Sequence, residues 1–264
     1  MSESINKNIK LIIAYDGTNY SGWQKQNNKI TIQGTIEDNI RDITGDQKIK
    51  LHGSGRTDAG VHAIGQVANF ITSSSLPVDR WANVLNNALP KDIRIKFAKQ
   101  VDSNFHARYS AKSKLYRYYI MTGNFRGENI IYTSKYAFLR NYCYFFNKKL
   151  DIDRMSESAK LLIGTHDFSS LSCLNKKKKQ RKQNKIRKII NIKITKKNNL
   201  VRFSIEANAF LYKMVRIIIG TLIDLSVEEH DPNEIIQILE NKNNFSSGQV
   251  VPPNGLYLIK VRYK

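Results

Sequence analysis

Apolar and polar residues alternate along this chain in two distinct periods. The apolar run Ile9–Tyr15, closed by Asp16-Gly17, is typical of a strand. Isoleucines then recur every three or four residues, which predicts a helix over 33–44 that stops at Gly45. The other elements expected in this part of the chain are extended segments at 48–51, 67–71 and 93–101, and a helix at 79–89.

The second part of the chain again shows strand-like and helix-like patterns in alternation. Segment 114–121 is rich in β-formers and places Tyr116 and Tyr118 on one face of a strand. Asp231-Pro232 predicts a helix start, with the aspartate as cap and the proline at the first helical position. The remaining expected elements are helices at 153–163 and 213–225 and strands at 186–195, 200–207 and 255–263.

This order of elements predicts an α+β fold. We expect two α/β subdomains, 1–108 and 109–264, that share a mixed, largely antiparallel sheet with a basic central cleft between them. No apolar run reaches the about 18–20 residues needed to span a bilayer, and the first residues lack the apolar core of a signal peptide. The two cysteines and five histidines show no metal-ligand spacing. We therefore expect a cytoplasmic protein without metal or cofactor.

The net charge of +21 indicates a polyanionic partner, because phosphate neutralisation drives nucleic-acid binding. A bias in genomic base composition toward lysine codons is an alternative source of some of this charge. The run KKKKQRKQNKIRK at 176–188 holds nine basic residues and no acidic ones, and we expect a basic insertion near 174–188. Without those nine residues the net charge is still +12, so the excess is spread over the fold.

The segment GSGRTDAGVHA at 53–63 is the strongest candidate for chemistry. Arg56 and Asp58 are framed by Gly53, Gly55 and Gly60, which let the backbone turn sharply and let a bulky ligand approach. An arginine close to a carboxylate keeps the carboxylate ionised, as a nucleophile or general base requires. The alternative is a tight turn in which Asp58 caps a helix and Arg56 makes a surface ion pair.

Seven further segments accompany this one in order. They are YDGTNYSGWQ at 15–24, TIQGTIE at 31–37, LNNALP at 85–90, FHARYSAKSKLYRY at 105–118, GTHDFSS at 164–170, AFLYKMVR at 209–216 and PPNGLYL at 252–258. Together they resemble the tRNA pseudouridine synthase A family over residues 9–263. The resemblance implies the pseudouridine synthase fold and an isomerase that converts uridine to pseudouridine at positions 38, 39 and 40 of the tRNA anticodon stem-loop. It also implies a homodimer that works without cofactor or metal.

The resemblance assigns roles to five residues. Asp58 matches the nucleophilic aspartate, and Arg56 the arginine that fills the space of the flipped base and contacts phosphates. Tyr116 matches the active-site tyrosine that stacks on the uracil. Arg216 matches the basic residue that pairs with the aspartate, and Leu256 an apolar residue against the bound base.

Each assignment has an alternative. Tyr118 lies on the same strand face as Tyr116 and could be mistaken for it, and Arg216 could extend from a helix surface into solvent. Leu256 could be ordinary core, and the histidines 62 and 106 could be structural rather than phosphate contacts. At the level of function, the alternatives are a synthase acting on another RNA and a non-catalytic RNA-binding protein of the same fold.

Overall fold

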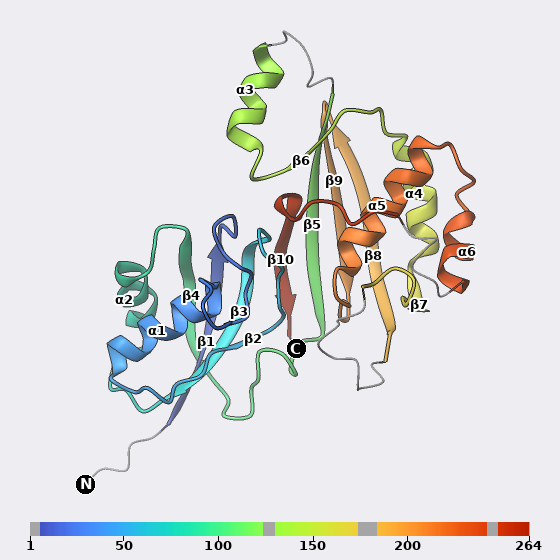
Figure 1. The fold of residues 1–264 in the computed structure, drawn as a ribbon. Coiled ribbons are helices and arrows are strands. Elements are labelled where there is room, and N and C mark those ends of the chain that lie inside the picture. Colours follow the sequence, from blue (N-terminus) through green and yellow to red (C-terminus); the bar gives the residue numbers. More distant parts are fainter. Residues whose placement is uncertain (1–5, 124–129, 174–183, 242–247, 264) are drawn as a thin grey trace. The chain divides into compact units, whose positions relative to one another are not determined.

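A computed structural model describes residues 6–123, 130–173, 184–241 and 248–263 (Figure 1). They form two compact units, one within Met1–Lys112 and Tyr257–Lys264, the other within Ser113–Leu256. The sequence-based division at residue 108 differs from this chiefly at the C-terminus. The last strand belongs to the first unit because Tyr257 and Leu258 pair with His62 and Ala63. Residues 174–183, which carry most of the lysine-rich run, lie outside the described residues.

The first unit is built on antiparallel strands. Its strand order is β4-β1-β3-β10, where β10 runs parallel to β3 and the short β2 pairs antiparallel with β3. The bounds are β1 Lys7–Tyr15, β2 His52–Gly53, β3 His62–Thr72, β4 Ile93–Val101 and β10 Leu256–Arg262. Alternate residues of β1, Ile9, Leu11 and Ile13, are fully buried, as the apolar run predicted.

Two helices complete the first unit, α1 (Ile32–Thr44) and α2 (Trp81–Ala88). Thr31 caps α1 by accepting a hydrogen bond from the Gly34 amide, and Gly45 ends it in the left-handed region at φ 71°. The predicted helix 33–44 is therefore confirmed. The helix expected at 79–89 is α2, preceded by a 3-10 turn at Val78–Arg80 and packed beside β4.

The segment at 48–51, which was expected to be extended, does not form a strand. A turn at 47–48 follows α1, and the strand forms only at His52–Gly53. The backbone groups of this segment bond to side chains instead of a neighbouring strand. Asp46 accepts from the Lys48 amide, Arg41 donates to the Ile49 carbonyl, and Glu37 accepts from the Leu51 amide.

The second unit contains the strand order β5-β9-β8-β7, all antiparallel, with β6 parallel to β5. The bounds are β5 Ser113–Thr122, β6 Tyr144–Phe146, β7 Gly164–Asp167, β8 Ile186–Lys197 and β9 Leu200–Ala207. The predicted strands at 114–121, 186–195 and 200–207 are confirmed. In each unit the strands are mixed and largely antiparallel, so the predicted α+β class is confirmed.

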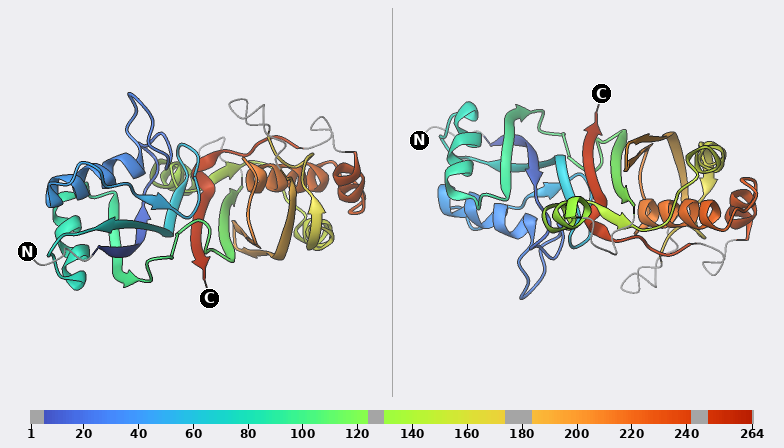
Figure 2. Two further views of the ribbon diagram at one scale, coloured as in Figure 1. Left: turned by 90° about the horizontal axis from the view of Figure 1, so that it is seen from below. Right: turned by 90° about the horizontal axis from the view of Figure 1, so that it is seen from above.

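The helices of this unit are α3 Ile130–Leu139, α4 Ile152–Leu161, α5 Met214–Val227 and α6 Glu234–Glu240, and a 3-10 turn at Pro253–Gly255 precedes β10. Almost every residue of α5 is buried, which explains its uniformly apolar sequence, and it lies alongside β9 and β8 (Figure 2). Helix α6 begins at Glu234, later than predicted, because Asp231 accepts from the Asn233 amide and forms a turn before the helix. No helix in the described parts of the chain is long and apolar enough to cross a membrane.

Candidate functional site

The segment 54–61 forms a fixed loop between β2 and β3. Its tightest point is the turn from Asp58 to Val61, closed by a hydrogen bond from the Val61 amide to the Asp58 carbonyl at 3.2 Å. Gly60 occupies the left-handed region in this turn, at φ 75°. The next element is the strand β3, so Asp58 does not cap a helix. Its half-buried side chain is presented at the start of a turn.

Thr57, the residue before Asp58, anchors the loop to the rest of the first unit. Its buried Oγ1 lies 2.8 Å from the Tyr15 hydroxyl, and its carbonyl accepts from the Trp23 amide at 3.1 Å. Burial raises the pKa of the Tyr15 hydroxyl well above its ordinary value, so this hydrogen bond stays between neutral groups. The side chain of Thr57 thus points into the core of the first unit, and its bonds to Tyr15 and Trp23 hold the loop in place.

The base of the loop is held by a second polar cluster centred on Gln66. Its Oε1 accepts from the Ser54 hydroxyl at 2.7 Å, and its Nε2 donates to the Gly55 carbonyl at 2.9 Å. Both Ser54 and Gln66 are fully buried. Gly53 is packed against the Trp23 indole so closely that a Cβ there would overlap the ring. Glycine at position 53 therefore lets the loop backbone lie directly against the Trp23 side chain.

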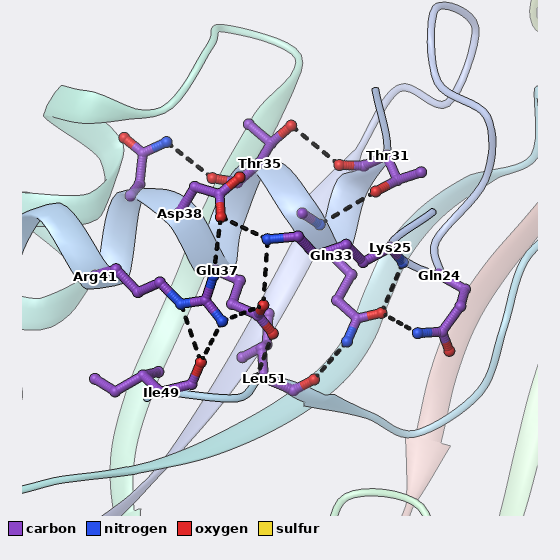
Figure 3. A network of polar contacts seen from close by, with 12 residues as sticks. Gln24, Lys25, Thr31, Gln33, Thr35, Glu37, Asp38, Arg41, Ile49 and Leu51 are labelled. Carbon is purple, nitrogen blue, oxygen red and sulfur yellow. Dashed lines mark hydrogen bonds and ion pairs between the residues drawn. The ribbon is translucent and has the colours of Figure 1, made fainter. Parts of the chain in front are cut away.

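A polar network on α1 holds two segments of the first unit, one after Trp23 and one before β2 (Figure 3). Glu37, which is only 5% exposed, pairs with Arg41 at 2.8 Å and with Lys25 at 3.4 Å. Its other oxygen accepts from the Leu51 amide at 3.0 Å. Gln33 donates to the Leu51 carbonyl and accepts from the Lys25 amide. Helix α1 thereby fixes the segment after Trp23 and the segment before β2.

Arg56 lies on the exposed side of the loop. It forms no ion pair with any residue that the structure describes, so the alternative of a surface salt bridge finds no support there. His62, at the start of β3, is buried instead. Its ring stacks on Tyr257 with centroids 4.7 Å apart, and its Nδ1 accepts from the Gly17 amide at 3.1 Å. These contacts give His62 a structural role beneath the loop.

In the second unit, the two tyrosines on one face of β5, Tyr116 and Tyr118, have different surroundings. Tyr118 is fully buried, and its hydroxyl donates to the Pro252 carbonyl at 2.7 Å. Burial raises the pKa of this hydroxyl, which keeps it protonated as a donor. Tyr116 is 7% exposed and meets the Phe210 ring edge-on at 5.1 Å. The hydroxyl of Tyr118 therefore has a structural role, as the donor to Pro252.

Arg216 lies in the first turn of α5 and is only 9% exposed. Its Nε donates to the Val251 carbonyl at 2.7 Å, so the alternative of an arginine extended from a helix surface into solvent is wrong. The segment 251–255 links Arg216 to β5. Within it, Pro252 accepts a hydrogen bond from Tyr118, and Gly255 packs against the Tyr118 ring. Leu256 is buried where this segment enters β10.

The candidate residues are divided between the units. Arg56 and Asp58 belong to the first, and Tyr116, Arg216 and Leu256 to the second. Sequence reasoning missed the supporting residues Tyr15, Thr57, Gln66 and Val251. For Thr57 the sequence did offer a signal, because it is a polar residue between the two candidates Arg56 and Asp58. Within the described ranges, no group of three or more histidine, cysteine or carboxylate side chains could hold a metal ion.

Comparisons with known proteins agree over nearly the whole chain. A family profile described as "tRNA pseudouridine synthase" matches residues 11–110 and 158–264. A relative from Caldicellulosiruptor saccharolyticus named "tRNA pseudouridine synthase A" is 46% identical over 257 residues, covering 97% of this chain and 100% of the relative. Relatives of the same name from Acetivibrio thermocellus and Clostridium kluyveri are each 45% identical with the same coverage.

A search of solved structures gives a more distant likeness. A chain from "Crystal Structure of a Cbf5-Nop10-Gar1 Complex" is 13% identical, with a TM-score of 0.36, and the match covers 81% of this chain and 54% of that one.

Proposed function

This chain belongs to the tRNA pseudouridine synthase family, a family of isomerases, and on that premise we propose that it converts uridine to pseudouridine at positions 38, 39 and 40 of the tRNA anticodon stem-loop. Asp58 is the nucleophile of this proposal. The observation that carries it is the presentation of Asp58 on a turn whose preceding residue, Thr57, is anchored to Tyr15 and Trp23. A nucleophile needs such fixed geometry.

The reaction is balanced within the substrate. The bond from uracil N1 to the sugar C1′ breaks, and a bond from uracil C5 to C1′ forms. The proton leaves C5 and a proton returns to N1, so no oxidant, reductant or energy source is consumed. The proposal gives Asp58 the central role in this exchange, either as a nucleophile that attacks C1′ or adds to the base, or as the general base that removes the C2′ proton in a glycal route.

The other residues bind and orient the substrate. A target base inside a stem must leave the helix, at a cost of a few kcal/mol (about 2–4). The exposed guanidinium of Arg56 fills the vacated space and contacts phosphates, because a planar cation both stacks and donates. Tyr116 stacks on the flipped uracil, Leu256 packs against it, and Arg216 pairs with Asp58. We propose further that the enzyme is a cytoplasmic homodimer.

The position of the product tests this function. The wild-type protein is incubated with an unmodified tRNA transcript that carries uridine at 38, 39 and 40, and pseudouridine is located by carbodiimide modification and primer extension. Stops are expected at the anticodon stem-loop, and a transcript with cytidine at these positions is the matched control. Product elsewhere would assign the enzyme to another RNA site. Bound tRNA without product would indicate a non-catalytic RNA-binding protein.

A further inference from the structure

An exposed cluster of aromatic rings in the first unit has no part in the site described so far. The rings of His52 and His106 lie 5.0 Å apart, and those of His106 and Tyr109 lie 4.4 Å apart. The Arg108 guanidinium lies 5.6 Å from the centre of the Tyr109 ring. We call these four residues the stacking platform. Tyr109 is 77% exposed, so its ring contributes little to the core.

The turn that carries the platform is closed by its own hydrogen bonds. The His106 amide donates to the Ser110 hydroxyl, and the Ser110 amide donates to the His106 carbonyl. The Nδ1 atom of His106 accepts from the Arg108 amide at 3.1 Å. These bonds order the turn before any ligand arrives, which lowers the entropy lost on binding.

Buried asparagines in the sheet fasten this turn from below. Asn69 accepts from the Ala107 amide at 2.8 Å, and Asn8 donates to the Phe105 carbonyl at 2.9 Å. The two asparagines also bond to each other, and Tyr263 donates to the Ala107 carbonyl at 2.7 Å. These bonds hold the turn in place, so the exposed ring of Tyr109 is presented to solvent on a rigid support.

The charges around the platform favour an anionic ligand. Among the described residues, the Arg108 guanidinium pairs with no carboxylate. Burial, together with nearby His52 and Arg108, lowers the pKa of His106, so its ring is neutral near pH 7 and suited to stacking. The whole chain carries a net charge of +21, which disfavours a cationic partner.

We propose that the stacking platform binds an unpaired nucleotide of RNA. The base stacks on Tyr109 and His106, and Arg108 contacts the adjoining phosphate. His52 is six residues before Asp58, so its Cα lies within about 20 Å of the Asp58 Cα even if the chain between them were fully extended. One RNA strand can therefore span both sites. This inference rests on the proposed function for the identity of that RNA as tRNA.

Binding measurements with single substitutions test the platform. Dissociation constants are measured for wild type, Tyr109→Ala, Tyr109→Phe and Arg108→Ala with a single-stranded oligouridylate, a blunt-ended RNA duplex and a tRNA transcript. Tyr109→Ala is expected to raise the Kd for the single strand and the tRNA about tenfold, the order expected for one lost base–aromatic stack. Tyr109→Phe keeps the ring and is expected to bind like wild type. Arg108→Ala is expected to weaken binding and flatten its salt dependence.

Two controls make the result specific. Phe138→Ala removes an aromatic ring that is 78% exposed on α3, and it is expected to leave every Kd unchanged. The blunt-ended duplex offers no unpaired base, so Tyr109→Ala is expected to alter its Kd less than twofold. Thermal unfolding confirms that each variant is folded.

The outcomes separate the platform from the proposed function. If wild type forms pseudouridine and Tyr109→Ala binds the single strand and the tRNA like wild type, the platform is overturned and the enzyme assignment stands. If wild type forms no pseudouridine but Tyr109→Ala selectively loses single-strand binding, the platform stands without the activity. An equal loss with Phe138→Ala, or a change only in the protein's self-association, would contradict a nucleotide site.

Discussion

At the scale of single residues, the backbone on either side of Asp58 is held by uncharged neighbours. Thr57 turns inward to Tyr15, Gln66 holds the backbone at Gly55, and Gly53 admits the Trp23 ring. None of these contacts is an ion pair. These supports of the loop backbone are packing contacts and neutral hydrogen bonds, which salt does not screen.

The substitution Gly53→Ala tests this packing. Because a Cβ at this position would overlap the Trp23 indole, the loop must shift, and overpacking of this kind costs about 1–3 kcal/mol. We expect a lower free energy of unfolding in urea and at least about tenfold slower pseudouridine formation, since catalysis depends on placement within an ångström. Gly45→Asn is the control, because Gly45 has open space around it and Asn tolerates the left-handed region. Wild-type stability and rate in Gly53→Ala would refute the close approach.

Sequence reasoning found the residues of the loop but not what supports them. Arg56 and Asp58 stand close together in the chain, within a glycine-rich pattern that is visible by eye. Tyr15 lies 42 residues from its partner Thr57, and Val251 lies 35 residues from Arg216. Periodicity and local motifs carry no information on such long-range pairs. The assigned roles of Arg56, Tyr116, Arg216 and Leu256 stay predictions.

At the scale of elements, α1 joins the segment after Trp23 to the segment that leads into β2 and the Asp58 loop. Its buried Glu37 joins Lys25 and the Leu51 amide to Arg41 (Figure 3). A carboxylate with this little exposure requires its partners, because desolvation of an unpaired charge is costly.

The substitution Glu37→Gln removes the charge and keeps the shape. The amide oxygen can still accept from Leu51, but the attraction to Arg41 and Lys25 is lost, and we expect the free energy of unfolding to fall by about 1–3 kcal/mol. Asp38→Asn is the control within the same network, since Asp38 is 57% exposed and its loss is expected to cost less than about 1 kcal/mol. Urea unfolding measures both. Equal effects of the two substitutions would show that the burial of Glu37 contributes nothing.

Most of the longer elements could be predicted from the sequence, but helix α3 was not expected, and β3 was expected only over 67–71. Helix α1 and strands β4, β5 and β9 each span several periods of a clear pattern, and α5 is a long apolar run. All five were expected close to their observed bounds. Strands β6 and β7 have three and four residues, which is too few to show a period. The segment at 48–51, expected to be extended, pairs with no strand, because side chains of α1 form hydrogen bonds with its backbone groups at Ile49 and Leu51.

At the scale of the whole molecule, charge and family membership point to the same substrate. The chain carries a net charge of +21, and +12 without the run at 176–188, so the excess does not depend on that one segment. The family profile covers parts of both compact units. The candidate residues are likewise drawn from both, with Asp58 from one and Tyr116 and Arg216 from the other. The basic cleft and the homodimer stay predictions, because neither follows from the structure of each unit alone.

The most direct test of the nucleophile is tritium release from tRNA labelled at uracil C5, because the hydrogen leaves C5 only when the new carbon–carbon bond forms. Wild type and Asp58→Asn are compared at equal, saturating tRNA, with the Kd of each measured in parallel. The account predicts release by wild type and none above background by Asp58→Asn, which keeps the size of the side chain and still binds tRNA. Release by Asp58→Asn at the wild-type rate would contradict the central claim that Asp58 carries the reaction.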